Sequence, residues 1–524
     1  MERFSPGRLA RRSLAGAVEL VPSSWATRFC DLEGLTATLL EHNFDQDHYE
    51  RFAGRRFKSR RMAGLHYLLI GSEAGWEPRP DFSPAYYRTA NPDVVIAGYE
   101  PFAHYCTFGR FEGRGALPAE DEPDDRDLQA PSLEVLLAHR PPARNGETTL
   151  VIMPVFGNRA LTLRAIDRVL SARTDRPFEF IVIDDASQDE ELSLDLRQLA
   201  HAKLLTLLVN VKNEGFVVSA NRGLRLHGGR DVVLLNSDTA VFDGWLDRLL
   251  TALRSAPNIG TVTPLSNAAT ILSYPLTLRD YDCSDMDYSE LDRSCAGLGI
   301  PNIEIPTGIG FCMAIRGACL DQVGYFDEHR FGRGYGEEND LCLRASARGW
   351  IHVAATDVFV WHRGGGSFKR ERAGRIAAAQ STLERIHPGY RVKISEFIAA
   401  DRLRPVREAL DIIRVARDGR RKILSIGGTD RSIAPGGICL RLIEDFGRFR
   451  NYYRVAGGQQ FPLANLPRLD RNASLQSMQK LLADLRIDEI RAVQRNASLT
   501  ATEQRVIEAG KAQGLHVFVG AFSR

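Results

Sequence analysis

The sequence lacks the patterns that would assign it to several large classes of protein. No apolar run approaches the roughly 18 residues that a membrane-spanning helix needs, and a net charge of +2 gives no broad basic surface for nucleic acid. The eight cysteines form no CxxC pair and no zinc-binding spacing, which suits free thiols in a reducing cytoplasm. Because 524 residues are too many for one core, we expect several domains. From the low net charge we expect no nucleic-acid partner.

Two common phosphate-binding motifs are also missing. Neither GxGxxG after the first expected strand nor GxxxxGK[ST] occurs, which disfavours a nicotinamide-binding Rossmann domain and excludes a P-loop. From 148 to 370, short apolar runs instead alternate with amphipathic segments. We expect strands at 148–156, 178–187, 203–210 and 231–238, and helices at 159–172, 189–200, 215–227 and 244–256. Such alternation predicts an α/β domain with a mostly parallel sheet flanked by helices.

Residues 1–117 contain a degenerate repeat with a period of 38 positions. Its first copy has Phe44, Tyr49, His66, Tyr67, Gly71 and Gly75, which recur as Phe82, Tyr87, His104, Tyr105, Gly109 and Gly113. The aromatic residues predict a small core, and the histidines are interpreted as structural. The second copy resembles a repeat often attached to bacterial polysaccharide glycosyltransferases, which implies a helical accessory or docking module. The acidic, Pro-rich segment 118–147 is interpreted mainly as a linker.

Polar and turn-forming residues follow the four expected strands of the central domain. The candidate binding residues are Pro154, Phe156 and Asn158 after the first strand, Asp184 and Asp185 after the second, Asn213, Gly215, Phe216 and Asn221 after the third, and Asn236, Ser237 and Asp238 after the fourth. The carboxyl ends of parallel strands meet at one edge of a sheet, where ligands bind. Carboxylates there can accept hydrogen bonds from a base or ribose, and can hold a divalent ion. By itself, 232–239 is equally compatible with a strand followed by an Asx turn.

The ordered set of motifs between about 148 and 365 resembles glycosyltransferase family 2, whose members have the GT-A fold. The resemblance implies a metal-dependent transferase that moves a sugar from a nucleotide diphosphate with inversion at the anomeric carbon. Asp238 then binds the metal. Asn236 replaces the first acid of the family's D-x-D motif and is placed nearer the ribose. The NEGFVVSANRGL segment is similar to a rhamnosyltransferase-like subset, which implies a dTDP- or UDP-linked donor.

A second cluster of candidates begins at GYGEENDLCLR. Acids in the first turn of a helix are favoured by the helix dipole whatever the function, but the family resemblance makes Glu338 the general base, with Glu337 as the second choice. It also implies that His362 joins the metal site. Imidazole with carboxylate suits Mn²⁺ better than Mg²⁺. The remaining candidates, assigned to the acceptor side and a lid, are Gly308, Asp340, Gly365 and Ser367.

The last part of the chain is expected to have a helical extension at 371–417 and a Rossmann-like α/β domain at 418–524. In that domain we expect a strand at 421–428 and a helix at 436–449, as in a truncated second glycosyltransferase half. The overall expectation is a cytoplasmic enzyme that acts on a glycan or lipid-linked glycan acceptor in bacterial surface-polysaccharide synthesis. Peripheral contact with the inner membrane or an assembly complex stays open. The alternative is a non-catalytic scaffold protein with a decayed transferase core.

Overall fold

The structure is a computed structural model of the chain. It describes residues 36, 39–40, 44–91, 94–95, 99–110, 114–117, 130–143, 148–278, 280, 287–332, 334–364, 369–426, 438–446, 451–456, 463, 465–466, 468–470, 473–494 and 499–521. The chain divides into two compact units, one of Asp121–Leu410 and the other of Met1–Glu120 with Asp411–Arg524. No helix of the described part is long and apolar enough to cross a membrane.

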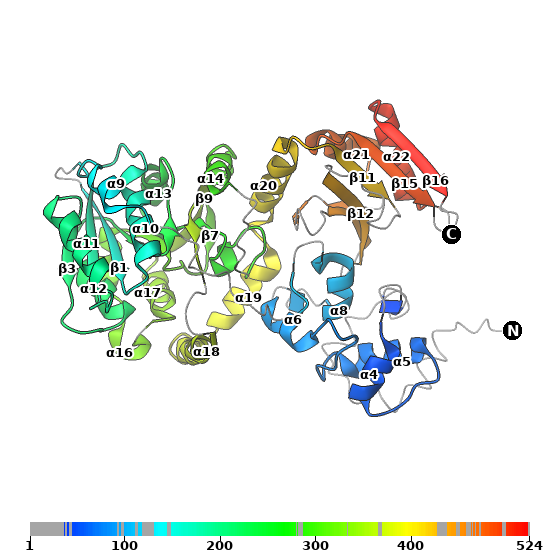
Figure 1. Cartoon of the computed structure of the whole chain (residues 1–524), viewed down its shortest axis with the longest axis horizontal. Helices are drawn as coiled ribbons and strands as arrows, with labels where there is room; N and C mark the ends of the chain where they lie inside the picture. Colours follow the sequence, from blue (N-terminus) through cyan, green and yellow to red (C-terminus); the bar gives the residue numbers. More distant parts are fainter. Residues whose placement is uncertain are drawn as a thin grey trace. The chain divides into compact units, whose positions relative to one another are not determined.

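The unit Asp121–Leu410 is built around an eight-stranded sheet in the order β3-β2-β1-β4-β8-β6-β9-β7 (Figure 1). The strands are β1 (Thr149–Val155), β2 (Phe178–Asp184), β3 (Thr206–Val209), β4 (Val232–Leu235), β6 (Ile259–Leu265), β7 (Ile303–Ile305), β8 (Cys312–Ile315) and β9 (Ile351–Phe359). All run in the same direction except β7 and β8, which pair antiparallel to their neighbours. The predicted mostly parallel α/β sheet is therefore confirmed.

Helices cover both faces of this sheet. On one face lie α9 (Leu133–Leu137), α10 (Arg159–Ser171), α11 (Glu190–His201), α13 (Trp245–Arg254) and α14 (Tyr288–Ala296), and on the other α12 (Phe216–Leu224), α15 (Gly317–Val323), α16 (Glu328–Phe331) and α17 (Glu337–Ser346). Each face of the sheet packs against its helices in a separate hydrophobic core. Alternate residues of β1 point into the two cores, Val151 and Met153 into the first, with α10 and α11, and Leu150 and Ile152 into the second, with α12 and α17. A strand buried on both faces explains why β1 reads as a continuous apolar run.

Two further features of this unit position the site. The short strand β5 (Thr239–Ala240) pairs antiparallel with β10 (Trp361–His362), and His362 is the register partner of Thr239. This pairing brings the end of β4 next to a segment more than a hundred positions later in the chain. The expected helical extension contains α18 (Lys369–Ile386), α19 (Tyr390–Ala400) and α20 (Arg404–Arg417). Leu383 of α18 packs in the second core.

The C-terminal domain has its own six-stranded sheet in the order β14-β13-β12-β11-β15-β16. Its strands are β11 (Lys422–Ile426), β12 (Ile438–Phe446), β13 (Asn451–Ala456), β14 (Arg468–Asp470), β15 (Glu489–Gln494) and β16 (His516–Ala521), and its helices are α21 (Leu475–Asp484) and α22 (Ala501–Ala512). The helix expected at 436–449 is wrong, because 438–446 is strand β12. Ile438, Leu440 and Leu442 are buried at every second position, which is the period of a strand.

The N-terminal module contains two similar sets of short helices. The first comprises α4 (Gln46–Ala53), α5 (Arg60–His66) and the π-helical turn η2 (Tyr67–Gly71), and the second comprises α6 (Pro84–Ala90), α8 (Pro101–His104) and η3 (Tyr105–Gly109). The Tyr49 hydroxyl lies 2.8 Å from Nδ1 of His66, and Tyr87 lies 2.9 Å from Nδ1 of His104. In both sets a Cβ on the glycine, Gly71 or Gly109, would collide with the tyrosine hydroxyl. The histidines thus have tyrosine partners within a packed aromatic core.

Candidate functional site

A cavity of about 570 Å³ opens at the carboxyl-end edge of the large sheet. Its polar lining includes Asn236 after β4, Glu337 and Glu338 at the start of α17, and His362 in β10. The loop before the antiparallel strand β8 contributes Phe311. The sequence separates these residues widely, but the carboxyl ends of parallel strands converge on one edge of the sheet.

Asp238 and His362 are neighbours, as the sequence analysis expected. Oδ1 of Asp238 lies 3.4 Å from Nε2 of His362, because the pairing of β5 with β10 places the two segments side by side. Burial raises the pKa of Asp238, but the charge and hydrogen bond of His362, a backbone hydrogen bond and the charge of Arg363 together lower it by more, so it lies below its ordinary value. Burial lowers the pKa of His362, but the Asp238 carboxylate, the Ala268 carbonyl and the charge of Asp280 together raise it by more, so it lies above its usual range.

The His362 ring is held in the orientation that a metal ligand needs. Its Nδ1 lies 2.6 Å from the carbonyl oxygen of Ala268. A carbonyl only accepts hydrogen bonds, so Nδ1 carries the proton and donates. In the neutral imidazole, Nε2 then has a lone pair facing Asp238. Phe311 stacks on the ring with its centroid 5.1 Å away.

Asn267 fixes the backbone of His362 and was missed by the sequence analysis. Its Oδ1 accepts from the His362 amide at 2.9 Å, and its Nδ2 donates to the His362 carbonyl at 2.8 Å. Asn267 follows strand β6, so the rule that polar residues after a strand form the site would have found it.

The donor set of this pair fits a divalent ion. Two ligands on adjacent positions of an octahedral ion lie about 3 Å apart at bond lengths near 2.1 Å, close to the 3.4 Å observed between Asp238 and His362. No group of three or more His, Cys, Asp or Glu side chains placed to hold a metal occurs in the described residues. Among the described residues, Asp238 and His362 would supply two ligands here, and diphosphate oxygens or water could supply others. Oδ1 of Asn236 is buried without a hydrogen-bond partner and is an acceptor that a bound ligand could satisfy.

Glu337 and Glu338 begin α17, whose N-cap is Gly336. Glu337 is 5% exposed, and its Oε2 has no hydrogen-bond partner. Burial raises the pKa of Glu337 well above its ordinary value, and the charge of Glu338 raises it further. Burial also raises the pKa of Glu338, although hydrogen bonds from backbone amides and Asn339 oppose the rise. Two neighbouring acids with raised pKa values on a cavity wall are suited to general acid–base chemistry.

Asn339 links Glu338 to the helical extension, which the sequence analysis did not foresee. Oδ1 of Asn339 accepts a hydrogen bond from the Thr307 hydroxyl and another from the Tyr390 hydroxyl, both at 2.9 Å. These two donors orient the amide so that its nitrogen is available to Glu338. Tyr390 lines the cavity from α19. No local sequence signal links it to Asn339, because the contact depends on the tertiary fold.

Tyr335 is a second lining residue that the sequence analysis missed. It adopts φ 74° between Gly334 and Gly336, which also have positive φ. A bulky residue in the left-handed region is a backbone outlier, and such outliers gather at ligand sites. The GYG sequence indicated a turn but gave no reason to choose its aromatic residue.

Asp184 and Asp185, at the end of β2, hold the loops where we expect the nucleotide to bind. Asp185 accepts from Asn210 Nδ2 at 2.7 Å and from the amides of Glu214 and Gly215 at 2.9 and 2.8 Å. Asp184 accepts from the Ser187 amide at 2.9 Å and the Ser193 hydroxyl at 3.2 Å. About one acceptor position of Asp185 is left for a ligand.

The other expected nucleotide-side residues occupy different positions. Asn158 caps α10 through the Leu161 amide at 3.2 Å. Phe216 lines the cavity, whereas the described lining does not include Pro154, Phe156, Asn213 or Ser237. Pro154 is buried in β1, and Phe156 is 55% exposed.

Three expected site residues have structural roles instead. Asn221 is fully buried and uses its amide on the backbone of Phe326 and on Glu328. Asp340 is 3% exposed and bonded to Arg344 and His387, each at 2.8 Å. A Cβ at Gly308 would lie 2.8 Å from the Met313 sulfur, so Gly308 serves close packing. Spacing along the chain could not reveal which way these residues face. Gly365 and Ser367 lie outside the described residues.

Comparison with known proteins identifies the central domain. Residues 150–323 match the family model Glycosyl transferase family 2. The chain is 37% identical over 141 residues to a putative polypeptide N-acetylgalactosaminyltransferase 13 of Drosophila melanogaster, a match that covers 24% of this chain and 25% of that protein. It is 26% identical over 244 residues to the N-acetylglucosaminyl-diphospho-decaprenol L-rhamnosyltransferase of Mycobacterium tuberculosis, which covers 40% of this chain and 74% of that protein.

Two solved structures are similar over part of their length. GalNAc-T7 with UDP, GalNAc and Mn²⁺ has a TM-score of 0.36 and 18% identity, covering 48% of this chain and 50% of its own. The mannosyltransferase PcManGT from Pyrobaculum calidifontis, in complex with GDP-Man and Mn²⁺, has a TM-score of 0.35 and 17% identity, covering 55% and 81%. The matched region is thus only a quarter of the Drosophila protein and half of the GalNAc-T7 chain. On the family match, residues 150–323 of this chain form a glycosyltransferase family 2 domain.

Proposed function

We propose that this chain is a metal-dependent inverting glycosyltransferase that moves a sugar from a nucleotide diphosphate to an acceptor hydroxyl. The observation that carries the proposal is the arrangement of one cavity, with the Asp238–His362 pair beside it and two acids of raised pKa on its wall. A divalent ion held by Asp238 and His362 would neutralise charge on the departing diphosphate. Mn²⁺ is the preferred ion, because the pair combines a nitrogen donor with an oxygen donor.

In this proposal, Glu338 takes the proton from the acceptor hydroxyl as that oxygen attacks the anomeric carbon. A base needs a pKa near the working pH, and burial raises the pKa of Glu338 in that direction. Asn339 holds the carboxylate in place. Glu337 is the alternative base, but its deeper burial favours the protonated form.

The donor and acceptor are proposed from chemistry and from one relative. The lining of the cavity includes the apolar residues Ile309, Leu383 and Ile394, which suit an acceptor with an apolar part. The name of the Mycobacterium tuberculosis relative gives it a lipid-linked acceptor and a rhamnosyl group. We propose a dTDP- or UDP-linked deoxyhexose or hexose as donor, and a glycan or lipid-linked glycan of the bacterial envelope as acceptor. Such an enzyme would work in the cytoplasm, at the inner membrane.

The test is a turnover assay that measures release of UDP or dTDP from a panel of nucleotide sugars with Mn²⁺ and lipid-linked acceptors. We expect Glu338→Gln to reduce turnover at least a hundredfold, the lower range for general-base catalysis, without loss of donor binding. Glu304→Gln, on the exposed surface of the same domain, is the matched control. If no donor in the panel turns over with the wild type while Mn²⁺ and nucleotide bind, the domain is a sugar-nucleotide-binding scaffold and the proposal is wrong.

A further inference from the structure

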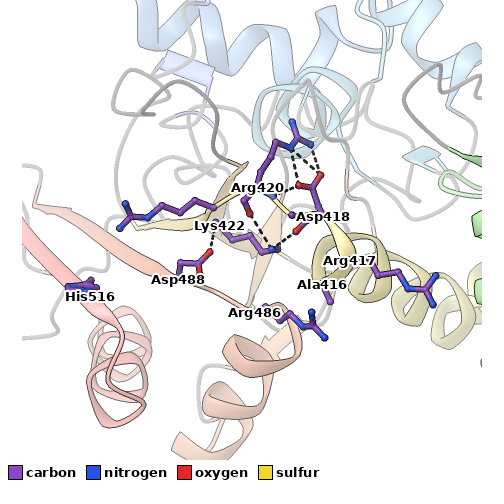
Figure 2. Close-up of a pocket in the computed structure, with 10 residues that line it drawn as sticks. Ala416, Arg417, Asp418, Arg420, Lys422, Arg486, Asp488 and His516 are labelled. Carbon is purple, nitrogen blue, oxygen red and sulfur yellow. Dashed lines mark hydrogen bonds and ion pairs between the residues drawn. The ribbon is translucent and has the colours of Figure 1, made fainter.

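The C-terminal domain has a second hollow, of about 640 Å³, at the amino ends of its parallel strands (Figure 2). It lies where β11 begins at Lys422, where β16 begins at His516, and just before β15 at Asp488. The end of α20 and the turn after α21 complete it. All of these residues belong to the segment Asp411–Arg524, so the hollow needs no other part of the chain.

The lining of this hollow carries more basic than acidic side chains, although one of the arginines, Arg421, pairs with the buried Glu489 at 2.7 Å. The basic side chains are Arg417, Arg420, Arg421, Lys422 and Arg486, with His516 beside them. The two lining carboxylates are already engaged. Asp418 binds Arg420 at 2.7 Å, and Asp488 accepts from the Lys422 amide at 2.8 Å. The chain as a whole has a net charge of only +2, so this concentration of charge is local.

Lys422 is the first feature that a simple solvated surface does not explain. It is 5% exposed, and lysine is almost never that buried unless it is paired. Its ammonium donates to the carbonyl oxygens of Asp418 and Arg420 at 2.7 and 3.2 Å. In the described part of the chain no carboxylate forms an ion pair with it. An ammonium has three donors, so one is left for an anion in the hollow.

Arg486 is the second such feature. It follows the C-cap of α21, and the amides of Arg486 and Ile487 bind the carbonyls of Ala483 and Leu482, each at 3.0 Å. This is a Schellman motif, whose left-handed position is usually glycine. Arg486 occupies it with φ 52°. The turn itself would therefore be served better by glycine, and the guanidinium forms no hydrogen bond or ion pair within the described residues. Figure 2 likewise draws no bond to it.

We propose that this hollow binds a phosphoryl group, supplied either by a lipid headgroup or by a soluble phosphate compound. Guanidinium groups bind phosphate oxygens in pairs of parallel hydrogen bonds, and an ammonium adds a point charge. Arg486 and Lys422 provide these two kinds of donor beside the other cations of the rim. The inference does not depend on glycosyl transfer, since none of these residues belongs to the family 2 domain.

The test uses the full chain in EDTA, so that the proposed metal site cannot take up a diphosphate. Inorganic pyrophosphate is titrated by calorimetry, and flotation is measured with phosphatidylcholine vesicles with and without phosphatidylglycerol. One cation near an anionic surface contributes a factor of about five in affinity, so reversal of its charge corresponds to about thirtyfold. We expect Arg486→Gly to weaken binding about fivefold and Arg486→Glu about thirtyfold. Arg505→Glu, on α22 and outside the hollow, is the control and should change affinity less than twofold.

Arg486→Gly separates a binding role from a structural one. Glycine suits the left-handed position, so the melting temperature of this variant should be equal to or above that of the wild type while binding falls. Binding of pyrophosphate alone would identify a soluble phosphate compound, and binding of phosphatidylglycerol vesicles would identify a lipid headgroup. The proposal is overturned if the wild type binds neither probe at low salt. It is also overturned if Arg486→Glu and Arg505→Glu weaken binding equally.

Discussion

Glu337→Gln is expected to stabilise the protein at neutral pH, because Glu337 is an acid in a place that disfavours its charge. The side chain is 5% exposed, Oε2 lacks a hydrogen-bond partner, and Glu338 lies next to it. Its folded-state pKa is well above the ordinary value. The pKa of Glu337 in the unfolded chain is the ordinary one. As pH rises from this pKa to the higher pKa of the folded protein, Glu337 loses its proton in the unfolded chain first. The folded state is therefore progressively destabilised with rising pH.

The expected size of the effect follows from the raised pKa. Each pH unit between the pKa of the unfolded chain and that of the folded protein costs the folded state about 1.4 kcal/mol, which for a domain of this size is roughly 3–5 °C in melting temperature. Glutamine keeps the shape and removes the charge. Melting temperatures are measured between pH 5 and pH 9 in EDTA, with Glu304→Gln as an exposed control. The melting temperature of the variant should exceed that of the wild type by an amount that grows as pH rises. If the two curves stay parallel over this range, the account of Glu337 is refuted.

Further predictions concern the residues that support the site. Tyr390→Phe removes one hydrogen bond to Asn339, worth about 0.5–1.5 kcal/mol, so kcat should fall roughly 2- to 12-fold with the donor KM unchanged; an equal rise in KM would contradict a role through Glu338. Asn267→Ala frees the backbone of His362, and Mn²⁺ affinity should fall about 10- to 100-fold in a calorimetric titration; unchanged affinity would exclude this role. Tyr335→Gly relieves a left-handed residue, so the melting temperature should not fall while donor affinity does; unaltered affinity would show that the ring does not contact the ligand.

The sequence was informative where function depends on the ends of strands. Apolar runs located the parallel strands β1 to β4, and of the polar residues after β4, Asn236 lines the cavity and Asp238 contacts His362. The topology of an α/β sheet makes this inference possible, because neighbouring parallel strands end at the same edge. The Asp238–His362 contact was expected only from the family resemblance, since it depends on the pairing of β5 with β10.

The sequence was misleading where the direction of a side chain decides the role. Asn221 and Asp340 carry the right chemical groups, but they face packed neighbours that are distant in sequence. Tyr390 was missed for the same reason, because α19 reaches Asn339 only in the folded chain. In the C-terminal domain, the helix expected at 436–449 is strand β12 instead, in which every second residue from Ile438 to Leu442 is buried.

The most direct test of the central claim is whether nucleotide binding depends on a metal held by Asp238. Calorimetry would measure UDP and dTDP binding to the wild type, Asp238→Asn and Glu338→Gln, each with Mn²⁺ and with EDTA. We expect the wild type and Glu338→Gln to bind one of these nucleotides with Mn²⁺ and much more weakly in EDTA, whereas Asp238→Asn has lost the Mn²⁺ dependence. Equal Mn²⁺-dependent binding by Asp238→Asn and the wild type would contradict the assignment of this site.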